Sequence, residues 1–111
     1  MSMAEAARSI DPAPIFAALG DRTRLSLLMR LSDGRTRSIT MLAADGSLTR
    51  QAVTKHLRVL QEAGLVENIR HGRESRFACR PESLEVARAY LDRVAAQWDD
   101  ALQRLKMFVE D

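Results

Sequence analysis

Hydrophobic residues in the first half of the chain recur at helical spacing, in four segments separated by residues that favour helix ends. A capping side chain precedes each segment: Asp11, Asp21, Ser38 or Thr49. A glycine lies at or just after the end of each segment. We therefore expect four short helices, with inner faces formed by Ile15, Phe16 and Leu19, by Leu25, Leu28 and Leu31, by Ile39, Leu42 and Ala43, and by Val53, Leu57 and Leu60.

The spacing of the hydrophobic residues changes after Gly64. The stretch LVENIRHGRESRFAC, residues 65–79, is rich in strand-forming residues around a turn at His71-Gly72-Arg73. This pattern predicts a β-hairpin. A two-stranded hairpin is marginal alone, so we expect it to pack on the helices.

A last helix is predicted from Pro81 or Ser83 to about Val109, about 40 Å in length. Its apolar residues recur at alternating spacings of three and four over four heptads. This apolar face is wider than one small domain needs to cover itself. We interpret this face, with the first helix, as a homodimer interface. An intrachain core stripe is the alternative, and Trp98 and Phe108 could also wall a pocket for an apolar ligand. The expected interface residues are Ile15, Phe16, Leu19, Leu84, Leu91, Val94, Trp98, Leu105 and Phe108.

The length of 111 residues, with 46% apolar and 29% charged residues, fits one folded domain. We expect a flexible tail over residues 1–10, a DNA-binding unit over 11–81 and a dimerisation helix over 82–111. The start lacks the pattern of a signal peptide, and no apolar run approaches a membrane span. These features favour a cytoplasmic protein without a membrane partner.

Charge is unevenly distributed along the chain. Residues 47–81 carry a net charge of +4, whereas residues 1–46 carry +1 and residues 82–111 carry −3. The middle segment alone therefore favours an anionic partner.

Residues 38–44 and 49–63 are two predicted helices joined by a short turn, as in a helix-turn-helix. One face of the second helix carries hydrogen-bonding and basic groups that can read base edges or hold phosphates of double-stranded DNA. A solvated helix face is the alternative. The residues on this face are Arg50, Gln51, Thr54, Lys55 and Arg58, after the capping Thr49.

The predicted hairpin is also basic around its turn, where Arg70, His71, Gly72, Arg73 and Arg76 gather. Two basic elements placed to meet one anion are harder to explain as solvated faces. The expected fold is mainly α with a small β-hairpin wing: a winged helix-turn-helix of about five helices, in the order α-α-α-α-β-β-α.

Three stretches, ALGDRTRLSLLMRL, LTRQAVTKHLRVLQEAGLV and RHGRESRF, resemble the arsenical-resistance-type (ArsR) winged-helix repressors of bacteria. The resemblance implies a homodimeric, sequence-specific DNA-binding repressor that a small ligand or metal releases from its operator. It places Thr49, Arg50, Gln51, Thr54 and Lys55 in the recognition helix, and Gly72 and Arg73 at the wing tip. Two-fold symmetry predicts an imperfect palindrome as operator. Autoregulation, with the operator upstream of the protein's own gene, is a further expectation.

The family's common metal sites are not matched. The stretch SITMLAADG lacks the Cys-x-Cys pair of the helix before the recognition helix, and the terminal helix has no histidine. We predict no metal site and no cofactor, and the effector stays unknown. His56 is expected to have a structural or phosphate-contacting role. Cys79 is expected to be a small core residue, with a lone redox sensor as the alternative.

A protein-interaction module and an enzyme are the alternative classes of function. A winged-helix module that binds proteins would not need so much positive charge on one face. Catalysis is not expected, because no nucleophile-base grouping, phosphate-binding glycine loop or metal cluster is visible in the sequence.

Overall fold

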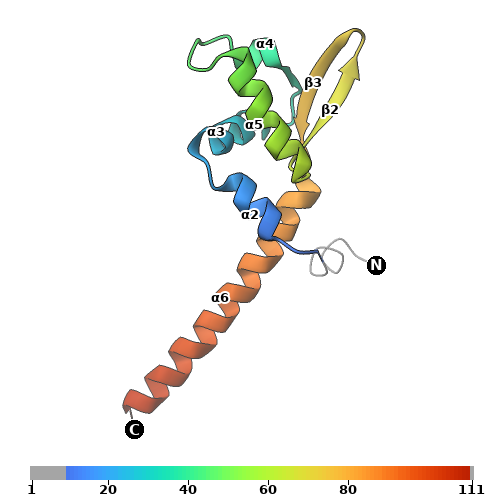
Figure 1. Ribbon diagram of the computed structural model, residues 1–111. Coiled ribbons are helices and arrows are strands. Elements are labelled where there is room, and N and C mark those ends of the chain that lie inside the picture. Colours follow the sequence, from blue (N-terminus) through green and yellow to red (C-terminus); the bar gives the residue numbers. More distant parts are fainter. Residues whose placement is uncertain (1–9, 111) are drawn as a thin grey trace.

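The computed structural model describes residues 10–110, so the expected N-terminal tail lies almost wholly outside them. The order of helices and the hairpin is as predicted, with a short additional strand before the third helix. In chain order the elements are α2 (Ala13–Leu19), α3 (Arg22–Leu31), β1 (Arg37–Ser38), α4 (Ile39–Leu42), α5 (Arg50–Glu62), β2 (Val66–His71), β3 (Glu74–Cys79) and α6 (Pro81–Glu110) (Figure 1).

The predicted capping residues start the helices. Asp21, Ser38 and Thr49 each accept the backbone N–H of the third residue ahead, at 3.0–3.1 Å, and so begin α3, α4 and α5. The first helix begins one residue later than predicted. Pro12 is its N-cap, and the Asp11 carboxylate accepts the N–H two residues ahead at 3.0 Å.

Helices α2 to α5, the sheet and the first turns of α6 enclose one hydrophobic core. The expectation that Leu25 faces inward is wrong, because 49% of its surface is exposed and Leu27 is buried in its place. Leu25 and Leu31 lie about 120° apart around a helix, whereas Leu27 and Leu31 lie within about 40°. The buried residues are Ile15, Ala18, Leu27, Leu28, Leu31, Leu42, Val53, Leu57, Leu60, Leu65, Val66, Phe77, Val86 and Ala87.

Strands β2 and β3 form the predicted antiparallel hairpin, closed by a two-residue turn in which Gly72 takes a φ of 65°. The unpredicted strand β1 pairs with the other edge of β3, giving the order β1-β3-β2. Ser38 lies opposite Arg76 in this pairing. The cap of α4 is therefore held beside the wing.

The C-terminal end of α5 is closed by a Schellman motif. The Leu65 N–H donates to the Leu60 carbonyl at 2.9 Å, and Gly64 takes the left-handed φ of 77° that this motif needs. The Ser83 hydroxyl, in the first turn of α6, donates to the Gly64 carbonyl at 2.5 Å. One junction thus fixes α5 relative to both the wing and α6.

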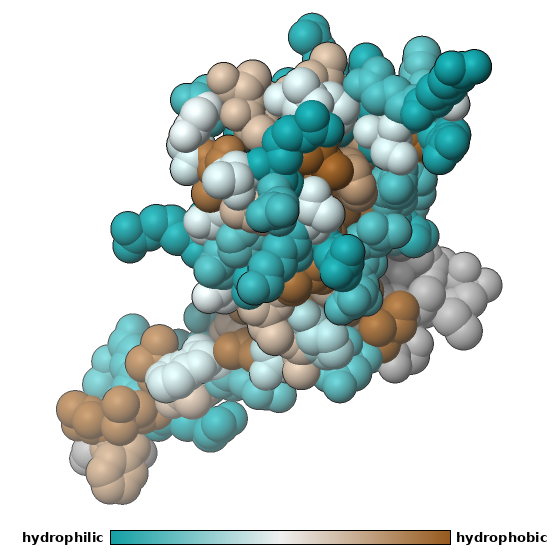
Figure 2. Space-filling model, turned by 45° about the horizontal axis from the view of Figure 1, so that its top comes forward, coloured by the Kyte–Doolittle hydropathy of each residue, from teal (hydrophilic) through white to brown (hydrophobic). Residues whose placement is uncertain are grey.

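Within residues 10–110, only the first turns of α6 pack against the other helices and the sheet. Val86 and Ala87 are buried, and the Tyr90 ring meets Phe16 edge-on at a centroid distance of 5.6 Å. Beyond this point the helix projects from the domain, so the molecule measures 67 × 35 × 21 Å (Figure 1). Figure 2 shows hydrophobic residues gathered at the far end of this helix. Within the described residues, no helix is both long and apolar enough to span a membrane.

Candidate nucleic-acid interface

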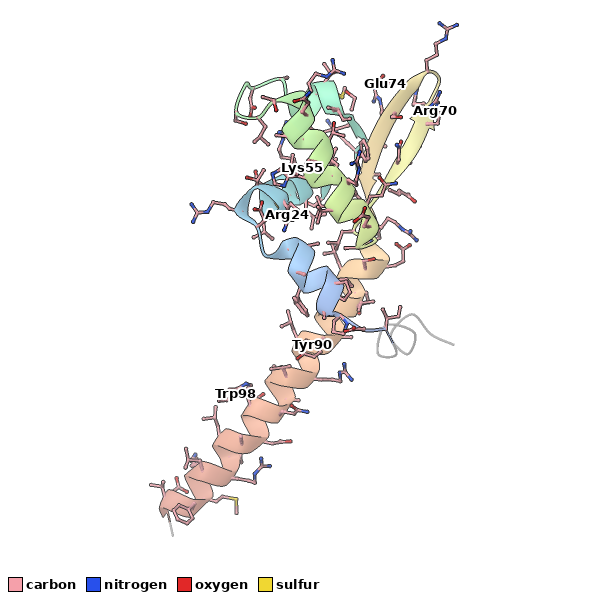
Figure 3. All side chains as sticks on the ribbon, viewed as in Figure 1. Arg24, Lys55, Arg70, Glu74, Tyr90 and Trp98 are labelled. Carbon is pink, nitrogen blue, oxygen red and sulfur yellow. The ribbon has the colours of Figure 1, made fainter. Side chains whose placement is uncertain are left out.

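Helix α5 has one buried face and one basic face. Val53, Leu57 and Leu60 are fully buried, as predicted. Arg50 and Lys55 are exposed on the other side, together with Gln51 and Arg58. Lys55 projects from the middle of the helix (Figure 3). The structure therefore leaves the guanidinium, ammonium and amide groups of the predicted recognition face accessible.

The two threonines of this face have fixed hydroxyl groups. Thr49 Oγ1 accepts the Ala52 N–H, which leaves the hydroxyl proton of Thr49 free to donate outward. Thr54 Oγ1 donates to the Arg50 carbonyl at 2.8 Å. Thr54 can therefore offer only an acceptor lone pair and a methyl group to DNA, a pairing that suits an exocyclic amine or a thymine methyl.

The wing carries its basic residues at the tip. Arg70, His71, Gly72 and Arg73 are all exposed there, as expected from the sequence. Arg76 lies three residues after Arg73, within β3, and is only half-exposed. Its Nη2 atom is 3.5 Å from Oε2 of Glu74 (Figure 3 labels Arg70 and Glu74). The wing therefore presents four predicted residues at its end and holds the fifth nearer the body.

The recognition helix and the wing share a hollow of about 540 Å³. Arg50, from the first turn of α5, and Arg73, from the wing, both line it. Helix α4 contributes Thr40, and β3 contributes Ser75. No local sequence pattern predicts these two hydroxyls at the site, because their place beside the wing depends on the pairing of β1 with β3. The side chain of Glu74 is the one acid in this lining.

His56 lies on the inner side of α5, away from the basic face. Its Nδ1 atom is 3.9 Å from Oδ2 of Asp21, the residue that caps α3. The same carboxylate oxygen accepts the Arg24 N–H, and this hydrogen bond is the largest cause that lowers the pKa of Asp21. Of the two roles expected of His56, structural or phosphate-contacting, this contact supports the structural one.

Cys79 is half-buried and packs against the edge of the core, as expected. Burial raises the pKa of its thiol, and the nearby Glu82 carboxylate raises it further. Reactive cysteines have lowered pKa values, so this environment is unlike that of a redox sensor. Among residues 10–110, no three His, Cys, Asp or Glu side chains are close enough to share a metal ion.

The residues expected at a dimer interface fall into two groups. Those near the domain contribute to its own core: Ile15 is buried, and Phe16, Leu19 and Leu84 pack at the core's edge. Val94 is half-exposed. Those further along α6, namely Leu91, Trp98, Leu105 and Phe108, are 54–82% exposed.

Within residues 10–110, Trp98 and Phe108 do not line a common pocket for an apolar ligand. The two rings are ten residues apart on one helix, or about 15 Å. A hollow of about 240 Å³ beside Trp98 is lined by Gln97, Trp98 and Ala101, without Phe108.

The helix-turn-helix is matched by a family model described as a helix-turn-helix domain, over residues 19–69. The HTH-type transcriptional regulator Rv2034 of Mycobacterium tuberculosis is 35% identical over 92 residues, which are 83% of this chain and 82% of the relative.

Solved structures agree with this match. An ArsR-like transcriptional regulator from Rhodococcus sp. RHA1 is 37% identical, with a TM-score of 0.81 over 99% of this chain and 97% of its own. A homodimeric winged helix-turn-helix DNA-binding domain from Mycobacterium bovis is 28% identical, with a TM-score of 0.59 over 77% of both chains. Sequence, fold and exposed basic helix together show that this chain belongs to the ArsR-type family of winged helix-turn-helix, DNA-binding transcriptional regulators.

Proposed function

We propose that the protein is a homodimeric repressor that binds an inverted-repeat operator in double-stranded DNA. The hollow shared by Arg50 of α5 and Arg73 of the wing is the observation that carries this proposal. A helix that enters the major groove and a wing that follows the flanking backbone would bring these two cations to one DNA segment.

Each basic residue has a role in this proposal. Arg50 and Gln51, at the start of α5, would read base edges, because the N-terminal part of a recognition helix lies deepest in the groove. Lys55 and Arg58 would hold phosphates, and Arg70 and Arg73 would contact the backbone beside the site. Repression follows if the bound dimer excludes polymerase from the promoter.

The homodimer is supported by the exposed apolar face of α6. Leu91, Trp98, Leu105 and Phe108 would cost free energy if they stayed in water, and a second copy would bury them. The relative from Mycobacterium bovis is homodimeric. A two-fold dimer would place its recognition helices about 34–36 Å apart, one turn of DNA.

The proposed protein needs no cofactor and no catalytic residue, and it acts where the chromosome is, in the cytoplasm. Its effector, if it has one, is not a soft metal held by the family's common ligand sets, because neither set is present in the sequence.

A gel-shift assay on the DNA upstream of the gene tests the proposal. We expect a complex that survives excess random DNA and weakens steeply with salt, because bound lysines and arginines release counterions. A footprint on that fragment should show an inverted repeat. Equal competition by random DNA would reduce the protein to a general DNA-binding domain, and no binding at low salt would favour a protein-interaction module.

A further inference from the structure

A second basic hollow, of about 500 Å³, lies beside the short strand β1. Arg35 and Thr36 line it from the chain leading into β1, and Arg37 lines it from β1 itself. Met41 lines it from α4, and Arg76 lines it from β3. Met41 also lines the hollow between α5 and the wing, so the two hollows adjoin. Three guanidinium groups from two separate segments therefore meet next to the proposed DNA-binding surface.

One of these three charges is already neutralised. Arg37 donates to both carboxylate oxygens of Asp33, at 2.8 and 3.0 Å, and also to the Arg30 carbonyl. The side-chain hydrogen bond from Arg37 holds the pKa of Asp33 well below its usual range, so the pair stays ionised. Arg37 therefore forms a fixed wall of the hollow. Arg35 supplies an exposed positive charge, and Arg76 supplies a guanidinium that is in contact with Glu74 through Nη2.

Arg76 has one side-chain donor without a partner. Its Nη2 atom is 3.5 Å from Glu74, but its Nε atom is buried and has no hydrogen-bond partner within the described chain. A buried donor left unpaired costs free energy. Nε and Nη2 of a guanidinium form a fork that matches two oxygens of a phosphate, so an oxyanion bound there would replace the 3.5 Å contact of Nη2 with Glu74.

We infer that this hollow binds one phosphate-type oxyanion, held by the guanidinium groups of Arg76 and Arg35. Arg76 supplies the fork, the exposed Arg35 supplies a second charge, and the Thr36 hydroxyl supplies a further donor. The oxyanion can be a DNA backbone phosphate, which rests on the proposed function, or a free phosphorylated molecule. The two sources share this chemistry and are separated by experiment.

The DNA arm measures the salt dependence of operator binding by Arg76→Gln and Arg35→Gln dimers. Each lost phosphate contact should reduce the slope of log Kobs against log[KCl] by about 0.9, or about 1.8 for the two protomers. Base preference should not change. Arg104→Gln, which removes the same charge from the distal half of α6, is the control and should keep the wild-type slope.

The free-ligand arm titrates inorganic phosphate into 15N-labelled protein, with sodium chloride at equal ionic strength as control. The expected result is a saturable shift of the Arg76 Nε–Hε and Thr36 amide signals, absent in Arg35→Gln protein. A reduced salt-dependence slope in the variants means that the hollow binds a phosphate of the DNA backbone. Saturable phosphate binding with an unchanged slope assigns it to a free oxyanion.

Wild-type slopes in both variants, together with no saturable shift, would overturn the inference even if the protein binds its operator specifically. If instead the wild-type protein binds no DNA, the proposed function fails. The phosphate titration alone then tests whether the hollow binds an oxyanion. Arg35 is exposed, so its variant tests the inference even if Arg76→Gln disturbs the sheet.

Discussion

The Nδ1 atom of His56, in the recognition helix, lies 3.9 Å from the Oδ2 atom of Asp21, which caps α3. The same oxygen accepts the Arg24 N–H at 3.0 Å. One carboxylate thus begins α3 and contacts α5 at the same point. The orientation of α5 relative to α3 therefore depends in part on this acid.

Replacing Asp21 by alanine should lower the melting temperature more than replacing it by asparagine, because asparagine still caps a helix. The pKa of Asp21 is lowered in the fold, so its charge stabilises the fold above its ordinary value of 3.8, and this contribution is lost as pH falls through the lower folded-state value. The melting difference between wild type and Asp21→Asn should therefore shrink as pH falls below about 4. Circular dichroism melts from pH 7 to pH 3 measure both effects. Equal losses for the two variants at pH 7 would mean that the charge matters more than the cap.

Arg50→Ala and Gln51→Ala should relax sequence choice, whereas Arg73→Ala should weaken binding to all sequences. The reason is that the start of α5 meets base edges in our proposal, and the wing meets the backbone. A lost bidentate base contact is worth about 1–3 kcal/mol of discrimination. Fluorescence anisotropy on the operator and on single-base variants measures it. If Arg73→Ala changed only one base preference, the wing would have to be reassigned to base reading.

Leu105→Glu should dissociate the dimer, because it places a charge in the apolar face of α6. Met107→Glu is the matched control. It lies two residues away on the same helix and is similarly exposed, 62% against 57%, but it projects from another side. Sedimentation velocity should show a monomer for the first variant and a dimer for the second. A dimer in both cases would place the interface elsewhere on the chain.

Gly64→Ala should destabilise the fold more than Gly46→Ala. Both glycines have a similar positive φ, 77° and 76°, which costs an L-residue about 1–2 kcal/mol. Only at Gly64 would the added Cβ meet another atom, Ser83 Oγ at 2.9 Å, whereas nothing lies within 4 Å at Gly46. Urea unfolding of the two variants separates the clash from the backbone strain. Equal losses would show that α6 shifts freely at this junction.

The sequence predicted the capped helices, the hairpin turn and the basic face of α5. Their signals are local: caps bond within three residues, and burial follows the period of one element. The Asp21, Ser38 and Thr49 caps were therefore predictable, as were the buried Val53, Leu57 and Leu60. The exposed position of Leu25 was not predictable, because the inward side of α3 depends on where its neighbours pack.

Only the tertiary structure determines which distant segments of the chain lie next to each other. Strand β1 has only two residues, so it has no alternation of its own and exists because β3 offers it a free edge. That pairing brings Arg76 next to the segment that carries Arg35, about 40 residues earlier in the chain. The sequence by itself determined a basic helix and a basic wing, since periodicity and turn chemistry are properties of neighbouring residues. The hollows that join their charges come from packing between distant segments, which no local pattern encodes.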